Sequence, residues 1–282
     1  MTETTEHVVT PEVKKRVLVA TILGAGIVFL DSSVANVALP AIQREFDMPT
    51  AAQQWVASSF LLVLSVLLLV GGRLADVFGR KRLFVTGLWA YSILALATAA
   101  SPSPTWLIVL RGMQGAAGAL LVPTTLALIN ATFRPEERGK AIGTWAAWSG
   151  ITTVLGPIVG GYAIDSLSWR WAFLLAPVVA VVALVSVRGV PESADPSASR
   201  RIDILGSVLV VLSLTGVVYA LIEAPVLGWG APQVIASLTA GIMLLPVFVW
   251  WQTRAARPVL PLAVFENRNL AAANVGTFFV YA

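Results

Sequence analysis

Eight apolar segments, each long enough to cross a lipid bilayer, constrain this chain more than any other feature. An α-helix rises about 1.5 Å per residue, so about 20 apolar residues span a hydrocarbon core of about 30 Å. The segments cover residues 17–40, 55–72, 83–100, 106–131, 141–164, 171–187, 204–222 and 234–252. Hydrophobic residues make up 57% of the chain and charged residues only 12%. The sequence therefore predicts an all-α integral membrane protein.

A ninth apolar segment begins at Leu270 and stops at Ala282, the last residue of the sequence. It would give a helix of about 20 Å, too short to cross the bilayer. We therefore expect a truncated chain whose ninth helix is incomplete. The expected organisation is a cytoplasmic tail over 1–16, a six-helix bundle over 17–187, a cytoplasmic linker over 188–203, a bridging transmembrane hairpin over 204–252, and a cytoplasmic segment with the start of the ninth span over 253–282.

The basic residues gather on one side of the predicted spans. Sixteen of the 19 lysines and arginines lie in the tail or in alternate connections, and cytoplasmic connections are enriched in these residues. This bias predicts a cytoplasmic N-terminus in the cell inner (plasma) membrane, and it explains the formal charge of +4 without a nucleic-acid partner. The chain has no cysteine, and its only histidine is His7, so we expect no disulfide, no His/Cys metal site and no cofactor.

A short basic loop over residues 72–82 joins the second and third apolar segments. Its glycines permit a sharp turn and close helix approach, and its basic run also fits ordinary anchoring at the cytoplasmic surface. The spacing Gly-x-Leu-Ala-Asp-x-x-Gly-Arg-Lys resembles the same loop in the major facilitator superfamily. That resemblance implies a loop that latches two helix bundles in one of two alternating states. The residues to which it gives this gating role are Gly72, Arg73, Asp76, Gly79, Arg80 and Lys81.

Two ionisable residues lie inside predicted spans, where each costs about 2.5–3.5 kcal/mol and a functional role is the default interpretation. Asp31 lies just beyond the middle of the first span, and Arg111 lies about one turn inside the fourth, on the same face as Gln114. A packing hydrogen bond from Asp31 to a serine or asparagine on a neighbouring span, and outward snorkelling of Arg111, are the structural alternatives. The two segments resemble the first-span motif of multidrug exporters and an Arg-x-x-Gln-Gly motif. The resemblance implies proton coupling by Asp31 and Arg111, supported by Asn36 and Gln114.

The fifth span is rich in glycine. Gly156 and Gly160 have Gly-x-x-x-Gly spacing, which permits close helix packing, and Pro157 predicts a kink. A tightly packed helix explains the pattern, but the run Gly-Pro-x-x-Gly-Gly also resembles the fifth-span motif of antiporters, which is rare in uptake symporters. Thr152 stands where the longer form of that motif has glycine. The residues of the antiporter-like helix are Gly143, Gly150, Gly156, Pro157, Gly160 and Gly161.

The segment after the eighth span resembles the re-entry to the second half of fourteen-span drug:proton antiporters. The resemblance implies a proton-coupled exporter of small, amphipathic or drug-like molecules, driven by the proton gradient and working by alternating access. A missing C-terminal bundle would then be required for a complete cavity. The alternative is a non-transporting fragment or a membrane subunit that depends on a partner. Catalysis is disfavoured because no nucleophile, base and orienting group lie together in the sequence.

Overall fold

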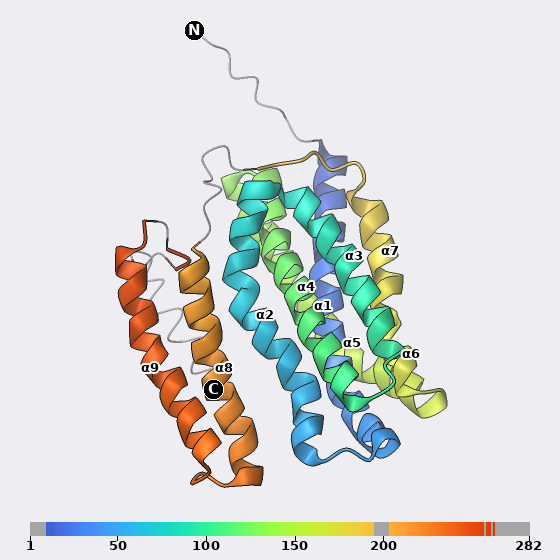
Figure 1. Cartoon of the computed structure of the whole chain (residues 1–282). Helices are drawn as coiled ribbons and strands as arrows, with labels where there is room; N and C mark the ends of the chain where they lie inside the picture. Colours follow the sequence, from blue (N-terminus) through green and yellow to red (C-terminus); the bar gives the residue numbers. More distant parts are fainter. Residues whose placement is uncertain (1–9, 195–202, 257, 261, 263–282) are drawn as a thin grey trace. The chain divides into compact units, whose positions relative to one another are not determined.

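The computed structural model describes residues 10–194, 203–256, 258–260 and 262, and these residues form helices and short connections without a strand (Figure 1). Eight helical segments are long and apolar enough to cross a membrane, which confirms the predicted number of spans. The chain divides into two compact units, within residues 1–199 and 200–282, and each is described by itself. The predicted ninth span, most of the N-terminal tail and residues 195–202 of the predicted linker lie outside the described residues.

The first unit contains the first seven helices, and the second unit contains the other two. In chain order the helices are α1 (Pro11–Phe46), α2 (Thr50–Phe78), α3 (Arg80–Ala99), α4 (Pro104–Thr132), α5 (Pro135–Ser166), α6 (Trp169–Phe173), α7 (Leu175–Val187), α8 (Ile204–Leu227) and α9 (Pro232–Arg254). Proline opens α1, α4, α5 and α9. It is favoured there because the first N–H groups of a helix have no intrahelical partner.

The predicted loop over residues 72–82 is wrong in extent. Helix α2 continues through Phe78 and α3 begins at Arg80, so that Gly79 alone lies between them. Gly79 has a φ of 103°, a conformation that favours glycine, and it turns the chain within one residue. Helix α2 extends past its apolar part because the Leu-Ala-Asp-Val-Phe run before Gly79 contains no glycine or proline to end it.

The predicted sixth span is helical but not continuous. It consists of the short helix α6 and of α7, and Leu174 lies between them. Pro177 explains the break, because proline lacks an N–H to bond the carbonyl of Phe173 and its ring clashes with that carbonyl. Taken together, residues Trp169–Val187 are still long and apolar enough to cross a membrane.

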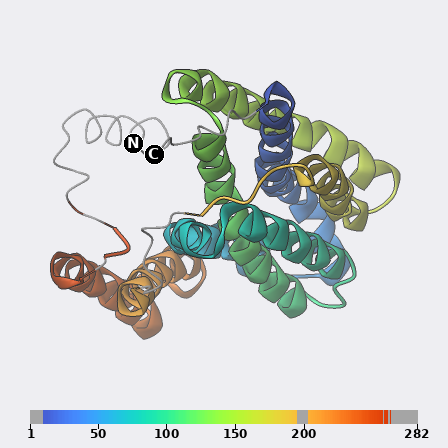
Figure 2. The ribbon, with the colours of Figure 1, turned by 90° about the horizontal axis from the view of Figure 1, so that it is seen from above.

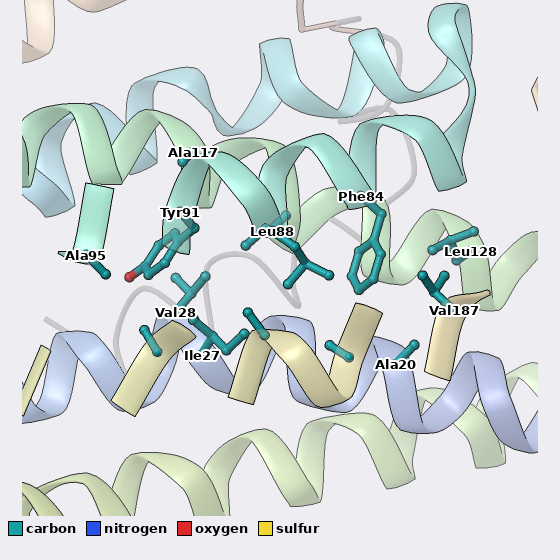
Figure 3. Packing of buried hydrophobic residues seen from close by; sticks show 14 of the residues in the cluster. Ala20, Ile27, Val28, Phe84, Leu88, Tyr91, Ala95, Ala117, Leu128 and Val187 are labelled. Carbon is teal, nitrogen blue, oxygen red and sulfur yellow. The ribbon is translucent and has the colours of Figure 1, made fainter. Parts of the chain in front are cut away.

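The core of the first unit forms around α1. Helix α1 packs against both α5 and α7, as the view along the helices in Figure 2 shows, and it also contacts α4. In Figure 3, Ile27 and Val28 of α1 lie near Leu88 and Tyr91 of α3, and all four are at most 1% exposed. Helices α2 and α4 form the most extensive pair, because Gly115 lets the backbone of α2 approach closely.

The second unit is a hairpin of α8 and α9. Gly216 and Gly241 let the two helices approach, and the Ser213 hydroxyl donates a hydrogen bond of 2.7 Å to the carbonyl of Gly241. At the start of α8, the Asp203 carboxylate accepts hydrogen bonds from the Gly206 amide and from two side chains of α9. The connection between the two helices is shorter than the interval between the predicted spans 204–222 and 234–252, because α8 continues to Leu227 and α9 begins at Pro232.

Candidate functional site

Asp31 and Arg111 form a buried ion pair between α1 and α4. Arg111 Nη1 donates to Asp31 Oδ2 at 2.5 Å, and the two side chains are 1% and 2% exposed, respectively. The predicted alternatives are therefore wrong. Arg111 does not extend outward to the membrane surface, and among the described residues the hydrogen bonds to Asp31 come from Arg111 and Gln114 and not from a serine or asparagine. The structure brings together the two ionisable residues that the sequence analysis selected from different spans.

Gln114 closes this pair into a ring of three side chains. Its Oε1 accepts a hydrogen bond from Arg111 Nη1 at 2.9 Å, and its Nε2 donates to Asp31 Oδ1 at 3.2 Å. The hydroxyl of Thr98 on α3 donates to the same Oε1 at 3.5 Å. Both carboxylate oxygens of Asp31 are therefore bonded. Gln114 lies about one turn after Arg111 and on the same face of α4, as predicted from the sequence.

Aromatic rings and a backbone carbonyl surround the Arg111 guanidinium. Its Nε donates to the carbonyl of Val56 on α2 at 3.4 Å, and its central carbon lies 4.3 Å from the ring centre of Phe60 and 5.5 Å from that of Phe173. A cation over an aromatic face is attracted by the ring quadrupole. Helices α2 and α6 therefore help to hold the arginine charge inside the bundle.

Tyr91 of α3 lies at the edge of the same cluster. Its side chain is 1% exposed, and its ring meets Phe60 edge-on at 6.4 Å between centres. Its hydroxyl is buried and makes no hydrogen bond to a described residue. Tyr91 was not among the predicted site residues, because an aromatic residue in an apolar span carries no signal that separates it from ordinary core.

Asn36 does not join the cluster. It follows Asp31 by five residues on α1, which rotates its side chain by about 140° around the helix axis. It is exposed in the structure, whereas Asp31 is buried. Its predicted supporting role stays a prediction that depends on what approaches this face of α1.

The glycines of the fifth span divide into two groups. A Cβ atom at Gly156 would lie 2.8 Å from the Cβ of Ser33, and one at Gly160 would lie 2.8 Å from the side chain of Val34. Both glycines therefore permit the close approach of α5 to α1, and Ser33 Oγ also donates to the Thr153 carbonyl at 2.7 Å. The Gly-x-x-x-Gly spacing predicted this packing.

The other small residues of the motif do not pack in this way. Added Cβ atoms at Gly143 and Gly150 would meet no described atom within 4 Å, and one at Gly161 would reach Val37 only at 3.9 Å. Pro157 lies within α5 and is exposed. Packing within the described unit therefore accounts for Gly156 and Gly160 and leaves the remaining motif positions unexplained.

The predicted gating residues lie at the joint between α2 and α3. Gly72 and Arg73 belong to α2, and Asp76 accepts a hydrogen bond of 3.0 Å from Arg80 across the joint. This pair fixes the bend at Gly79, because its members come from the two helices that meet there.

A segment that follows α7 covers the start of α3. Lys81 Nζ donates to the carbonyls of Val190 and Arg188 at 2.6 and 3.2 Å. The Glu192 carboxylate accepts hydrogen bonds of 3.0 Å from the amides of Lys81 and Arg82. This segment belongs to the predicted linker. Glu192 was not among the predicted site residues, because it lies more than 100 residues from Lys81 in the chain.

Comparison with known proteins identifies the family. The family model described as Major Facilitator Superfamily matches residues 21–280 of this chain. The chain belongs to the Major Facilitator Superfamily. Members of this superfamily are transporters and not enzymes, and the membrane-spanning helices make this chain a multi-pass membrane protein. The resemblance inferred from the loop after α2 is confirmed.

Several relatives in this superfamily are named for resistance or export. The puromycin resistance protein of Streptomyces alboniger is 39% identical over 86% of this chain and 48% of its own length. The multidrug resistance protein Stp of Mycobacterium tuberculosis is 36% identical over 93% and 49%. The tetracenomycin C resistance and export protein of Streptomyces glaucescens is 34% identical over 92% and 48%. The chain thus spans about half the length of the relatives it matches.

Solved structures of superfamily transporters share the fold. A peptide transporter in complex with sulfate aligns with a TM-score of 0.63 at 18% identity, covering 86% of this chain and 53% of that one. A bacterial homolog of the human lysosomal transporter Spinster, in an inward-facing conformation, aligns with a TM-score of 0.55 at 18% identity, covering 86% and 62%. These similarities confirm the predicted all-α major facilitator fold.

Proposed function

We propose that this chain is part of a proton-coupled exporter, and that Asp31 and Arg111 couple proton binding to transport. The main support is the buried ring of Asp31, Arg111 and Gln114, which places a carboxylate and a guanidinium between membrane-spanning helices. Ionisable groups at that depth are expensive and commonly serve ion pathways.

The charge balance of the ring supports a coupling mechanism. When Asp31 takes up a proton, the negative charge that compensates Arg111 is lost. A buried arginine without its partner costs several kcal/mol, so the protonated state favours an arrangement in which water or another acid reaches Arg111. In an alternating-access transporter, that change accompanies rocking of one helix bundle against the other.

The substrate proposed is a small, amphipathic or drug-like molecule that leaves the cytoplasm in exchange for protons. The names of the relatives, which include puromycin resistance and tetracenomycin C export, support this class and this direction. The antiporter-like glycine run of α5 supports antiport. The proposed location is the cell inner membrane with a cytoplasmic N-terminus, supported by the distribution of basic residues.

Helix α5 supports the need for a second bundle. Val154, Ile158 and Tyr162 follow each other at intervals of one turn, and they are 67%, 64% and 77% exposed within the described unit. We propose that a C-terminal bundle covers part of this face and completes the cavity. The alternative is a non-transporting fragment or a partner-dependent membrane subunit.

The test is proton-gradient-dependent efflux of a lipophilic cationic dye from cells. The chain is expressed alone and joined to the C-terminal half of the Streptomyces alboniger relative. We expect efflux from the joined protein only, and we expect a protonophore to abolish it. Absence of efflux from a joined protein that reaches the membrane would favour the non-transporting alternative.

Two variants of the joined protein test the coupling role. Asp31→Asn removes the proton-binding carboxylate, and we expect it to abolish gradient-driven efflux. Glu136→Gln is the matched control, because Glu136 is an exposed acid in the first turn of α5, and we expect it to leave efflux unchanged. Gradient-driven efflux by the Asp31→Asn variant would exclude Asp31 as the coupling residue.

A further inference from the structure

A groove with a volume of about 370 Å³ runs between α3 and α7. Its walls are apolar and include Val85 and Trp89 of α3 and Val181 and Val185 of α7. Trp89, Val181 and Val185 are each more than half exposed, so the groove is open. Both helices belong to segments that are long and apolar enough to cross a membrane. The groove therefore offers apolar surface where the surroundings are hydrocarbon.

Two basic side chains close one end of this groove. Lys81 lies in the first turn of α3 and Arg188 follows the last residue of α7, and both line the groove. The Lys81 ammonium is held in place by the carbonyls of Val190 and Arg188. Among the described residues, no carboxylate forms an ion pair with either side chain. Within the described part of the chain, the Lys81 ammonium is therefore fixed in position, and neither it nor Arg188 has an anionic partner.

The neighbouring charges leave this end positive. Glu192 is the acid that contacts this region, and its two oxygens accept hydrogen bonds from backbone amides at the start of α3. Arg82 adds a third basic group, 82% exposed, at 4.0 Å from Glu192. Among the described residues, the carboxylate of Glu192 therefore serves backbone amides and Arg82, and it forms no ion pair with Lys81 or Arg188.

We propose that this groove binds an anionic phospholipid, with an acyl chain along the apolar walls and the phosphate between Lys81 and Arg188. The geometry fits an amphiphile because the cations stand at the end of two membrane-spanning helices, where headgroups lie. Trp89 lies eight residues further along α3, about 12 Å deeper. Basic pockets between transmembrane helices on the cytoplasmic side recognise anionic headgroups. A zwitterionic lipid such as phosphatidylcholine gains less from the two cations, because its choline ammonium is repelled by them. This inference does not depend on the proposed transport activity.

Trp89 provides the test, because brominated acyl chains quench tryptophan fluorescence only on close contact. The purified chain in detergent micelles is titrated at low lipid content with brominated phosphatidylglycerol and brominated phosphatidylcholine. The quenching assigned to Trp89 is the part that a Trp89→Phe variant loses. We expect the phosphatidylglycerol concentration that gives half-maximal Trp89 quenching to be at least about fivefold lower than the corresponding phosphatidylcholine concentration. A fivefold difference corresponds to the attraction of about one basic residue near the membrane surface. Equal concentrations for the two lipids would overturn the proposal.

Variants separate the headgroup from the acyl chain. Arg188→Gln should raise the concentration of phosphatidylglycerol needed for half-maximal quenching about fivefold, and it should raise the phosphatidylcholine concentration by a smaller factor. Lys140→Gln, which changes an exposed base on α5 away from the groove, should alter neither. Val185→Phe narrows the groove and should weaken Trp89 quenching by both lipids. A headgroup site would be contradicted if Arg188→Gln and the wild type needed the same phosphatidylglycerol concentration for half-maximal Trp89 quenching. Helical circular dichroism must be unchanged in the variant.

A competition experiment distinguishes a lipid from a free anion. Inorganic phosphate at millimolar concentration should leave the phosphatidylglycerol titration unchanged, because it gains none of the apolar contacts along the walls. Loss of Trp89 quenching on addition of inorganic phosphate, with potassium chloride at equal ionic strength as control, would mean that the site selects the phosphate alone and would overturn the proposal of a phospholipid.

Discussion

Gln114 donates a hydrogen bond to Asp31 across the interface between α4 and α1, and it accepts one from Arg111 on its own helix. Replacing Gln114 with leucine keeps a similar volume but leaves one carboxylate oxygen of Asp31 unpaired in a buried site. An unsatisfied buried acceptor costs about 1–3 kcal/mol. We therefore expect Gln114→Leu to lower the midpoint of thermal unfolding in detergent.

The matched control for this substitution is Gln54→Leu on α2. Gln54 is exposed, and surface substitutions change stability by about 0.5 kcal/mol or less. An equal shift of the midpoint in both variants would show that the hydrogen bonds of Gln114 contribute nothing measurable.

The ion pair itself makes a stronger prediction. Arg111→Leu leaves Asp31 buried without its compensating charge, and removing one partner of a buried pair costs about 3–5 kcal/mol. The double variant Asp31→Asn, Arg111→Leu removes both charges, so it should recover most of that loss. Denaturant unfolding of the two single variants and the double variant gives the coupling free energy. A double variant whose loss equals the sum of the two single losses would contradict the buried pair.

Hydropathy predicted the spans, because helices are one of the few structures that satisfy every backbone polar group in lipid. It did not predict where the helices end. Helix α2 runs to Phe78, beyond the predicted end at residue 72, because the bilayer limits the apolar part of a helix and not its length. The break at Leu174 follows from Pro177, whose effect on the preceding turn the sequence analysis did not use.

The residues of the candidate site were likewise predicted only in part. Asp31, Arg111 and Gln114 stood out in the sequence because polar groups are expensive in an apolar span. The family resemblance suggested that Asp31 and Arg111 pair, but the atoms that meet and the place of Gln114 between them could not be predicted, since they depend on how α1 and α4 are rotated against each other. Phe60 and Tyr91 contact the same cluster but gave no signal, because aromatic residues are common in spans.

The glycines of α5 predict opposite effects of one substitution. Gly160→Ala places a Cβ atom 2.8 Å from Val34, so we expect it to destabilise the packing of α5 on α1 by about 1–3 kcal/mol. Gly150→Ala meets open space, and alanine favours a helix over glycine by about 0.8–1.0 kcal/mol, so it should stabilise the described unit. Thermal unfolding of both variants in detergent provides the measurement. Destabilisation by both to the same extent would contradict the distinction between the two positions.

The hairpin of α8 and α9 should lose stability in acid. Burial raises the pKa of Asp203, but hydrogen bonds from Trp251, the Gly206 amide and Gln252 outweigh it and hold this pKa below its ordinary value of 3.8. A carboxyl with a lowered folded-state pKa stabilises the folded state fully above its unfolded pKa, and that contribution disappears as the pH falls below about 3.8. Asp203→Asn should therefore reduce the change in the hairpin's unfolding free energy between pH 5 and pH 2. Hydrogen exchange at α8 amides measures this free energy. An unchanged pH dependence in this variant would exclude Asp203 as its source.

Glu192 predicts a local effect at the start of α3. Its carboxylate accepts hydrogen bonds from the amides of Lys81 and Arg82, two of the first N–H groups of the helix, which have no intrahelical partner. A negative charge at a helix N-terminus is also favourable. Glu192→Ala removes both bonds, so these amides should exchange with solvent about five to tenfold faster, equivalent to about 1 kcal/mol. Amides in the middle of α3 should not change, because they keep their intrahelical partners.

Glu136→Ala is the control, since Glu136 is an exposed acid in α5, and it should leave the exchange of the Lys81 and Arg82 amides unaffected. If the two amides exchange equally fast in wild type and Glu192→Ala, then the segment after α7 does not hold the joint between α2 and α3 in solution.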